Sequence, residues 1–251
     1  MVNTIKKSIR IMDILSTEGS LGSQDIARKL NLPKSSVHNI LTTLESERLV
    51  ERNPETGRFH LGVKLISLGH IAQQSLDVGR VARPIMGSLN QQTNETVHLT
   101  MLDGNEVLYV DCIESTKRLR TYSVIGVRAP LYCTSVGKAI LAFQTSGFIH
   151  NYLETVPRHS YTSNTLVNKP DLLEELERVR HTGHAFDNME HEDHLRCVGA
   201  PVRNAMGKVF ASISVSGPEQ RISEQSLPKL AEETKATANE ISQRLGYNGG
   251  H

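Results

Sequence analysis

Hydrophobic residues recur every three or four positions over the first part of the chain, which is the spacing of one face of an α-helix. Three such stripes are separated by glycines and a proline. They are Ile5, Ile9, Met12 and Leu15, widened by Ile11 and Ile14; Ile26 and Leu30; and Val37, Ile40, Leu41 and Leu44. We expect the hydroxyl of Ser23 to cap the second helix, Asn31 to end it, and Pro33 to turn the chain. The pattern therefore predicts three short helices.

The polar pattern becomes that of a hairpin directly after the third helix. In ERLVERNPETGRFHLG, short strands at residues 49–52 and 58–61 flank a turn through Asn53, Pro54 and Gly57. Three helices followed by a hairpin is the order of a winged helix-turn-helix domain. We assign residues 1–64 to such a domain, with the third helix as the element that enters the major groove of DNA.

The exposed face of that third helix is rich in small polar groups. Lys34 can meet a phosphate, and Asn39 can pair with adenine through two hydrogen bonds. Which of the other side chains read bases and which contact phosphates stays open. A merely solvated face, or a winged helix used for protein contacts, is the alternative. The predicted DNA-binding residues are Ser23, Gln24, Lys34, Ser35, Ser36, His38, Asn39, Thr42, Arg52 and Arg58.

Helical spacing continues beyond the hairpin and then gives way to alternation. Leu65, Leu68, Ile71 and Ala72 predict a linker helix over residues 65–76. From Glu95 the period is two. ETVHLTMLDGNEVLYVDCIE predicts a hairpin about Asp103-Gly104, LRTYSVIG another strand, and LRCVGAPV with KVFASISVSG a further hairpin turning between residues 204 and 207.

Helices alternate with these strands. TSVGKAILAFQ predicts a helix capped by Thr134 or Ser135, and KPDLLEELERVRHTG a helix with Pro170 in its first turn and Gly183 after its end. The stretch SEQSLPKLAEETKATANEISQRLG closes the chain as a long amphipathic helix, with Pro228 near its start. Hairpins with intervening helices predict an α+β domain over residues 77–251, in which helices flank an antiparallel sheet.

One strand of this second domain has a polar face. In KVFASISVSG, Ala211, Ile213 and Val215 share one face, which we expect to pack against helices. The opposite face carries Ser212, Ser214 and Ser216, with Phe210 at its head. It can line a polar pocket, and the helix start at Ser135 offers backbone N–H groups that suit a carboxylate. The alternative is an ordinary sheet face with solvated serines.

Composition places the basic character in the first domain. The chain has 28 Lys and Arg against 27 Asp and Glu, but residues 1–64 hold ten basic and seven acidic side chains. Three cysteines without C-x-x-C spacing indicate reduced thiols in a cytoplasmic protein. No stretch approaches the roughly 20 apolar residues of a membrane span. We therefore expect a soluble protein with no membrane partner.

The sequence resembles the IclR family of transcriptional regulators over nearly its whole length. The motifs that carry the resemblance are PKSSVHNILTTLESERLVERNPETGRFHLG, GVKLISLGHIA, RAPLYCTSVGKAILAF, GHAFDNMEHEDHLRCVGAPV and ASISVSGPEQRIS. LRTYSVIGVRAPLY and ISQRLGY look most like the KdgR-type regulators of sugar-acid catabolism. The resemblance implies a GAF-like effector-binding domain at residues 77–251 and a linker helix that helps to pair two chains.

The resemblance also implies an effector site when the family's ligand-facing positions are carried onto matching motifs. Glycine is common in relatives at the place of Ser135, so the hydroxyl here adds a donor or narrows the pocket. The resemblance places Thr121 and Ala129 in the roof of the pocket. The predicted effector-binding residues are Thr121, Ala129, Ser135, Asp187, Leu195, Cys197, Ser214 and Ser216.

A metal site and a nucleophilic site are two alternatives in the second domain. The run HTGHAFDNMEHEDH gathers His181, His184, His191 and His194 among acids, but it lacks H-E-x-x-H spacing, so we expect no metal and leave metal binding by residues 181–194 open. Cys197 with a histidine and Asp187 resembles a nucleophilic triad, yet nothing supplies an oxyanion hole. Phosphate-binding glycine motifs are absent, and we expect neither cofactor nor catalysis.

The sequence as a whole predicts a transcriptional regulator. We expect a homodimer or homotetramer that binds double-stranded operator DNA and represses a catabolic operon, under the control of a small carboxylate or sugar acid. The family holds activators as well, so an activator of aromatic or organic acid catabolism is one alternative. A ligand-responsive interaction module without catalysis is the other.

Overall fold

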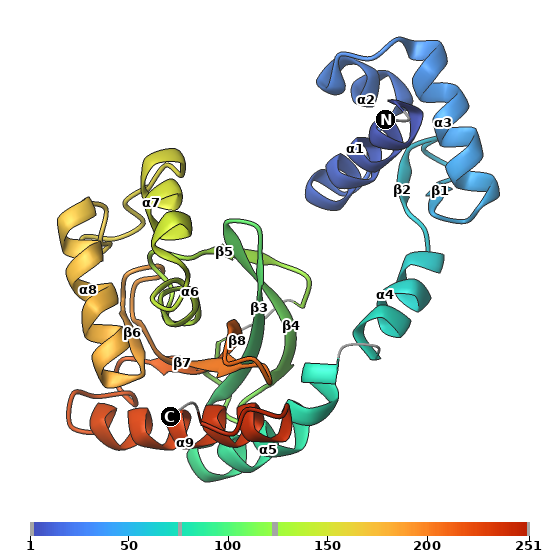
Figure 1. Ribbon diagram of the computed structural model, residues 1–251. Coiled ribbons are helices and arrows are strands. Elements are labelled where there is room, and N and C mark those ends of the chain that lie inside the picture. The colour runs from blue at the N-terminus through green and yellow to red at the C-terminus, as the bar shows by residue number, and fades with distance from the viewer. Residues whose placement is uncertain (1–2, 75–76, 122–124, 250–251) are drawn as a thin grey trace. The chain divides into compact units, whose positions relative to one another are not determined.

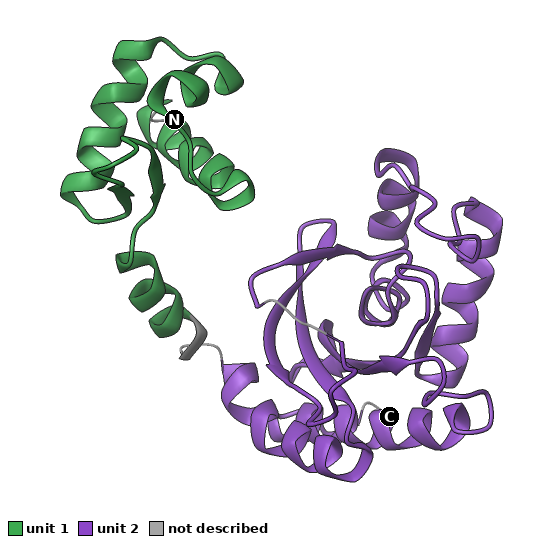
Figure 2. Ribbon diagram, turned by 180° about the vertical axis from the view of Figure 1, so that it is seen from behind, with its two compact units in different colours: residues 1–75 green, residues 76–251 purple. Residues whose placement is uncertain are grey.

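The computed structural model describes residues 3–74, 77–121 and 125–249 of the chain. The chain divides into two compact units, residues 1–75 (unit 1) and residues 76–251 (unit 2) (Figure 2). Each unit has its own hydrophobic core, since the buried apolar residues of unit 1 form a cluster separate from those of unit 2.

Unit 1 has the predicted order of three helices, a hairpin and a linker helix. Its elements are α1 (Asn3–Glu18), α2 (Ser23–Leu30), α3 (Lys34–Ser46), β1 (Val50–Arg52), β2 (Phe59–Leu61) and α4 (Lys64–Gln74). β1 and β2 pair antiparallel, with Glu51 opposite His60. The three predicted helices and the hairpin are therefore confirmed.

Two details of unit 1 differ from the predictions. The residue at the N-cap of α2 is Gly22, whose carbonyl accepts the first helical bond from the amide of Ile26, so Ser23 lies inside the helix and caps nothing. In α1 the buried residues are Ile11 and Leu15, whereas Ile5 and Ile9 are 59% and 48% exposed. Asn31 ends α2 as predicted, in the left-handed conformation with φ of 52°.

Unit 2 is built on a six-stranded antiparallel sheet with the strand order β5-β4-β3-β8-β7-β6. The strands are β3 (Thr96–Asp103), β4 (Glu106–Ile113), β5 (Arg128–Pro130), β6 (Ala185–Asn188), β7 (Leu195–Arg203) and β8 (Val209–Pro218). The two predicted hairpins, β3-β4 and β7-β8, are confirmed. They join where β3 pairs with β8, which brings residues near position 98 beside residues near position 214.

Helices cover both faces of this sheet (Figure 1). α5 (Asp77–Thr93) and α9 (Leu227–Arg244) pack on one face, against Ala211, Ile213 and Val215 of β8, as the alternation predicts. The sheet curls around α6 (Ser135–Leu141) on its other face, and α7 (Ser146–Thr155) and α8 (Lys169–Thr182) lie beyond α6. The polar face of β8 therefore looks toward α6.

The sequence did not predict every element of unit 2. α5, α7 and β6 had no counterpart among the predictions. The expected strand in LRTYSVIG falls partly on residues 122–124, which lie outside the described residues, and the described flanks at 119–121 and 125–126 are not strand. The described strand in this region is β5 at residues 128–130. No helix in the described residues is long and apolar enough to cross a membrane.

Candidate DNA-binding surface and effector pocket

The predicted recognition helix α3 has one buried and one exposed face. Val37, Ile40, Leu41 and Leu44 are buried in the core of unit 1. On the other face Lys34, Ser35, His38, Asn39 and Thr42 are exposed, and Ser36 is half-buried. The Thr42 hydroxyl donates to the carbonyl of His38 at 3.0 Å, so its proton is used within the helix. The remaining polar groups of this face are open to a partner.

The other predicted DNA-binding residues lie on α2 and on the hairpin. Gln24 is exposed and Ser23 half-buried at the start of α2. The guanidinium group of Arg52 lies 5.6 Å from the centre of the Phe59 ring, and its Nε donates to the carbonyl of Gly57. Arg58 donates from Nε to the carbonyl of Ser20 at 3.1 Å. Arg52 is thus held against the hairpin and Arg58 against the loop before α2, and both arginines are exposed.

A cavity of about 160 Å³ lies in unit 2 between the polar face of the sheet and α6. Its wall includes every residue predicted to bind an effector, and these come from several elements of the unit. They are Thr121, Ala129, Ser135, Asp187, Leu195, Cys197, Ser214 and Ser216. The structure thus brings the eight together in one place.

Strand register explains why residues so distant in sequence share this wall. Asp187 of β6 lies opposite Cys197 of β7, and Cys197 lies opposite Ser216 of β8. Side chains of residues opposite one another project to the same face, so the three form a row across three strands. Ser212, the third serine of the polar face, is used otherwise, since its hydroxyl donates to the carbonyl of Val136 at 3.0 Å.

α6 closes the cavity from the other side. Thr134 is its N-cap, and the Thr134 hydroxyl oxygen accepts a bond of 3.1 Å from the amide of Gly137, as predicted. Gly199 of β7 lets this helix approach the sheet, because a Cβ atom there would lie 2.5 Å from the carbonyl oxygen of Ser135. Ser135 is therefore pressed against the cavity, and it is only 2% exposed.

Asp187 is the buried acid of the cavity. Its Oδ1 accepts hydrogen bonds from the backbone amides of Glu190, at 2.8 Å, and His191, at 3.4 Å. Burial raises the pKa of this carboxyl to about 7, although these bonds oppose the change. Asp187 therefore titrates near neutral pH and can either donate or accept a hydrogen bond from a ligand.

A buried lysine supports the turn that follows Asp187. Lys138 of α6 is 1% exposed and donates to the carboxylate of Glu190 at 2.5 Å. Its ammonium group also lies 3.1 Å from Glu175 of α8, which Arg178 contacts in turn. Because charged groups are buried only when paired, this network fixes the turn from which Asp187 receives its bonds.

The cavity wall also holds eight residues outside the predicted effector-binding set. They are His98, Tyr109, Val127, Arg128, Thr134, Val136, His191 and Glu192. His98 of β3 lies opposite Ser214 of β8 and packs edge-to-face on Tyr109 of β4, with ring centres 5.3 Å apart. Burial lowers the pKa of His98 to about 4, so the imidazole is neutral at physiological pH. The alternating pattern of VHLTML places His98 and Thr100 on the same face of a strand. The sequence does not show that this strand pairs with β8.

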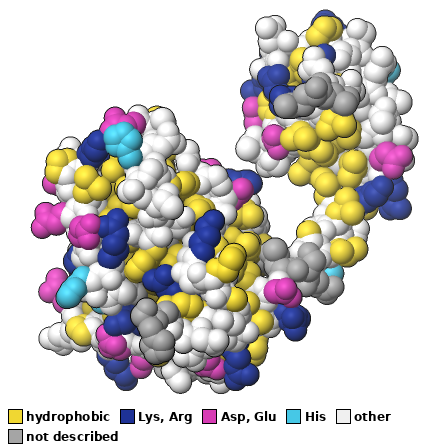
Figure 3. Space-filling model, viewed as in Figure 1, with side chains coloured by type: hydrophobic (Ala, Val, Ile, Leu, Met, Phe, Trp, Pro, Cys, Tyr) yellow, Lys and Arg dark blue, Asp and Glu magenta, His cyan; other side chains and the backbone are white. Residues whose placement is uncertain are grey.

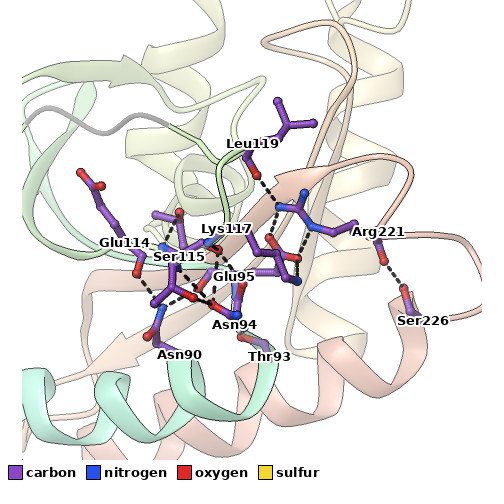
Figure 4. Close-up of polar contacts among 12 residues, drawn as sticks. Asn90, Thr93, Asn94, Glu95, Glu114, Ser115, Lys117, Leu119, Arg221 and Ser226 are labelled. Carbon is purple, nitrogen blue, oxygen red and sulfur yellow. Dashed lines mark hydrogen bonds and ion pairs between the residues drawn. The ribbon is translucent and has the colours of Figure 1, made fainter.

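The segment that leads into the roof of the cavity is anchored by Glu95 (Figure 4). The buried Glu95 carboxylate accepts bonds from Arg221 at 2.6 and 2.7 Å and from Lys117 at 2.8 Å. Arg221 also donates to the carbonyl of Leu119 at 2.9 Å. We call these four residues, Glu95, Lys117, Leu119 and Arg221, the Glu95 clasp. Two residues beyond Leu119 stands Thr121, whose buried hydroxyl has no partner among the described residues.

The histidine-rich segment does not converge on one point. His194 contacts Glu219 at 2.7 Å, His184 packs on Phe186, and His191 packs on Tyr161. Within residues 3–74, 77–121 and 125–249, no three His, Cys, Asp or Glu side chains are grouped to hold a metal ion. Burial raises the pKa of Cys197 well above its ordinary value, which disfavours the thiolate that a nucleophile needs.

Both units match models of known protein families. Residues 4–54 match the IclR helix-turn-helix domain, and residues 70–243 match the C-terminal domain of the bacterial transcriptional regulator IclR. The chain is 34% identical to the HTH-type transcriptional regulator KdgR of Escherichia coli, over 98% of this chain and 94% of the relative. It is 31% identical to the E. coli HTH-type transcriptional regulator XynR, over 98% of both chains. The crystal structure of Thermotoga maritima IclR superposes with a TM-score of 0.77 at 33% identity, covering 98% of this chain and all of the other.

Proposed function

The chain belongs to the IclR family and is a DNA-binding transcriptional regulator, and we propose that a small organic acid bound in the unit 2 cavity controls it. The regulator acts as a repressor of a catabolic operon and works in the cytoplasm. A related E. coli protein, 29% identical over 99% of this chain, is the transcriptional repressor IclR, which supports repression. Activation of an organic acid pathway is the alternative.

The observation that carries the proposal is the hydroxyl-lined cavity about Asp187. Ser135, Ser214 and Ser216 bring three hydroxyl groups to a wall that also holds apolar side chains, among them those of Val136 and Leu195. Sites for small molecules combine apolar surface with polar groups that converge, and this wall has both. A surface of merely solvated serines would not be 2–3% exposed, as these three are.

The size of the cavity favours a compact ligand. Its volume is about 160 Å³, and a protein cavity of roughly 150 Å³ holds a molecule as large as benzene. A short acid such as pyruvate or glyoxylate fits this volume, whereas a six-carbon sugar acid exceeds it. We therefore place short 2-oxo acids ahead of sugar acids as candidates.

Recognition of DNA is assigned to α3 and the hairpin of unit 1. The exposed polar face of α3 matches what the major groove demands, and Arg52 and Arg58 supply charge for the phosphates. Single helix-turn-helix units bind weakly, and dimers place two reading helices about 34 Å apart. A dimeric or tetrameric regulator is accordingly part of the proposal.

Apolar side chains on unit 1 supply a surface for that pairing. Ile5 and Ile9 of α1 are exposed, and Ile66 and Ile71 of α4 are 74% and 63% exposed. Hydrophobic atoms on the visible surface of unit 1 are coloured yellow in Figure 3. Exposed apolar patches of this kind mark sites of protein contact. We propose that a second copy of the chain covers them.

Ligand binding changes DNA affinity only through a difference in its affinity for two arrangements of the protein. Coupling of about 1–3 kcal/mol, which changes the dissociation constant 5- to 150-fold, is sufficient for a switch. No catalytic step is proposed, because Cys197 is buried as a thiol and the acid beside it serves as a ligand group. The alternative to a DNA-binding regulator is a module in which unit 2 responds to a ligand and unit 1 binds no DNA.

A thermal-shift panel of small carboxylates tests the effector assignment. The panel holds pyruvate, glyoxylate, 2-keto-3-deoxygluconate and aromatic acids. A ligand at a hundred times its dissociation constant stabilises by about 2.7 kcal/mol, which raises Tm by several degrees. We expect a short oxo acid to raise Tm in the wild type and not in Asp187→Ala. A panel without any effect would contradict an acid effector.

A further inference from the structure

His98 lies between the two serines of β8 that line the cavity. Its Nδ1 is 3.4 Å from the Ser214 hydroxyl oxygen and 3.3 Å from the Ser216 hydroxyl oxygen. The register explains this position, because His98 is opposite Ser214 and its neighbour two residues before, Thr96, is opposite Ser216. The imidazole is 3% exposed, and it forms part of the cavity wall. One ring nitrogen is thus shared by two hydroxyl groups that also face the ligand space.

The protonation of that nitrogen decides which way both hydroxyl groups point. A neutral imidazole carries a proton on one nitrogen and a lone pair on the other. If Nδ1 held the lone pair, it would accept one well-aligned hydrogen bond from a serine, normally with about 2.7–2.9 Å between nitrogen and oxygen. The second serine would then have no bond to Nδ1. The two distances are instead nearly equal and both long. That geometry fits a single N–H shared between two acceptor oxygens, a three-centre bond.

We propose that His98 is a specificity-determining residue that donates its Nδ1 proton to Ser214 and Ser216 and so turns both hydroxyl protons into the cavity. This proposal rests on the proposed effector pocket. With their oxygens engaged by His98, the serines act as donors, and the ligand must present acceptor oxygens to β8. A carboxylate or a keto group meets that demand, whereas an ammonium group at the same place does not.

The packing around His98 keeps its ring in this orientation. Tyr109 lies edge-on to it with an angle of 79° between the rings, and the strand pairing with β8 fixes the backbone. His98 acts on the ligand through the serines and is therefore a positioning residue. Its removal must alter ligand choice without abolishing the cavity, which distinguishes it from a residue that only fills space.

The tautomer of His98 can be measured directly in the full-length protein without any ligand. Two-bond ¹H–¹⁵N correlation spectra of protein labelled with ¹⁵N-histidine report which ring nitrogen carries the proton, and His98→Asn identifies the signals of His98. We expect the pattern of the Nδ1–H tautomer, and a displaced Nδ1 resonance in both Ser214→Ala and Ser216→Ala. The Nε2–H pattern would overturn the proposal.

Pyruvate serves as the probe for the consequence in binding. In His98→Asn the side-chain amide places an N–H group at the position of Nδ1. In His98→Gln the amide lies one carbon further from the backbone, and in His98→Leu the side chain has no donor. We expect His98→Asn to bind pyruvate within about threefold of the wild type, and His98→Gln and His98→Leu to bind about tenfold more weakly or worse. Equal losses in all three variants would refute the positioning role. If the wild type itself does not bind pyruvate, the oxo-acid assignment fails, while the tautomer spectrum still decides the role of His98.

Discussion

The Asp187 carboxyl group accepts a 2.8 Å hydrogen bond from the backbone amide of Glu190, so the acid that faces the ligand space also holds the turn after β6. Glu190 is itself fixed by the buried ammonium group of Lys138. The wall of the cavity and the core of unit 2 are therefore mechanically connected at this point. A ligand that changes the charge of Asp187 acts on a structural bond as well as on the cavity.

The stability of the protein should depend on pH through Asp187. Its folded-state pKa is about 7, raised by burial from 3.8, so between these values the folded protein holds a proton that the unfolded chain has lost. The free energy of unfolding contributed by this group is therefore highest below pH 4 and falls as pH rises toward 7, by at most about 4 kcal/mol. Asp187→Asn removes that dependence.

Urea unfolding at pH 5 and pH 8 measures the effect. Tyrosine fluorescence follows unit 2 specifically, because all six tyrosines lie beyond residue 76 and the chain has no tryptophan. Asp187→Asn should gain stability relative to the wild type as pH increases. Parallel pH profiles for the two proteins would show that Asp187 has an ordinary pKa.

The Glu95 clasp should contribute more to the free energy of unfolding than an exposed ion pair on the same segment. Arg221→Met leaves the buried Glu95 carboxylate with Lys117 alone, and we expect unit 2 to lose about 2–3 kcal/mol. The matched control is Arg120→Gln, which breaks the half-exposed pair with Glu114 and should change stability by less than about 1 kcal/mol. Urea titrations of both variants check this, and similar losses in the two would contradict the clasp.

A methyl group at Gly199 should push α6 away from the sheet. The added Cβ would lie 2.5 Å from the Ser135 carbonyl oxygen, a backbone atom that cannot step aside, so Gly199→Ala should cost about 1–3 kcal/mol and weaken ligand binding. Gly147→Ala is the control, because nothing lies within 4 Å of a Cβ there and helix α7 favours alanine. Its stability should be unchanged or higher by up to about 1 kcal/mol. Equal behaviour of both variants would refute the close approach of α6.

Substitutions on α3 should separate base reading from phosphate binding. Asn39→Ala should reduce the preference for operator over random DNA by about 1–3 kcal/mol, since a bidentate pair with adenine is lost. Lys34→Ala should weaken binding to operator and random DNA equally. It should also lower the slope of log affinity against log salt concentration by about one. Thr43→Ala, exposed on the same helix but outside the predicted set, is the control. Fluorescence anisotropy at several salt concentrations gives all of these values, and an unchanged preference in Asn39→Ala would remove that residue from the base-reading set.

The sequence predicted those elements whose hydrophobic spacing, turn or cap residues lie within a few positions of one another. The stripe of α3, the hairpin about Asp103-Gly104 and the Thr134 cap are of this kind. The cap at Ser23 was wrong because Gly22 can adopt the extended N-cap conformation without a side chain, which moves the helix start by one residue. Helix α5 was missed although Val78, Ala82, Met86 and Leu89 have helical spacing, since Pro84 interrupts the pattern.

The cavity could be predicted only in part, because its wall depends on how strands from distant segments align. The resemblance to a family pointed to positions such as Asp187 and Ser216, and all eight line the cavity. His98 enters that wall only through the pairing of β3 with β8, more than a hundred residues later in the chain. No local periodicity encodes such a register.

The most direct test of the account is the effect of an acid on DNA binding. Anisotropy titrations use a DNA fragment from upstream of the protein's own gene, with and without each acid of the panel, for the wild type and Ser216→Ala. We predict that affinity falls steeply with salt, and that one short oxo acid changes the dissociation constant at least about fivefold in the wild type but not in Ser216→Ala. DNA binding that no acid alters, or an equal response in Ser216→Ala, would contradict control through this cavity.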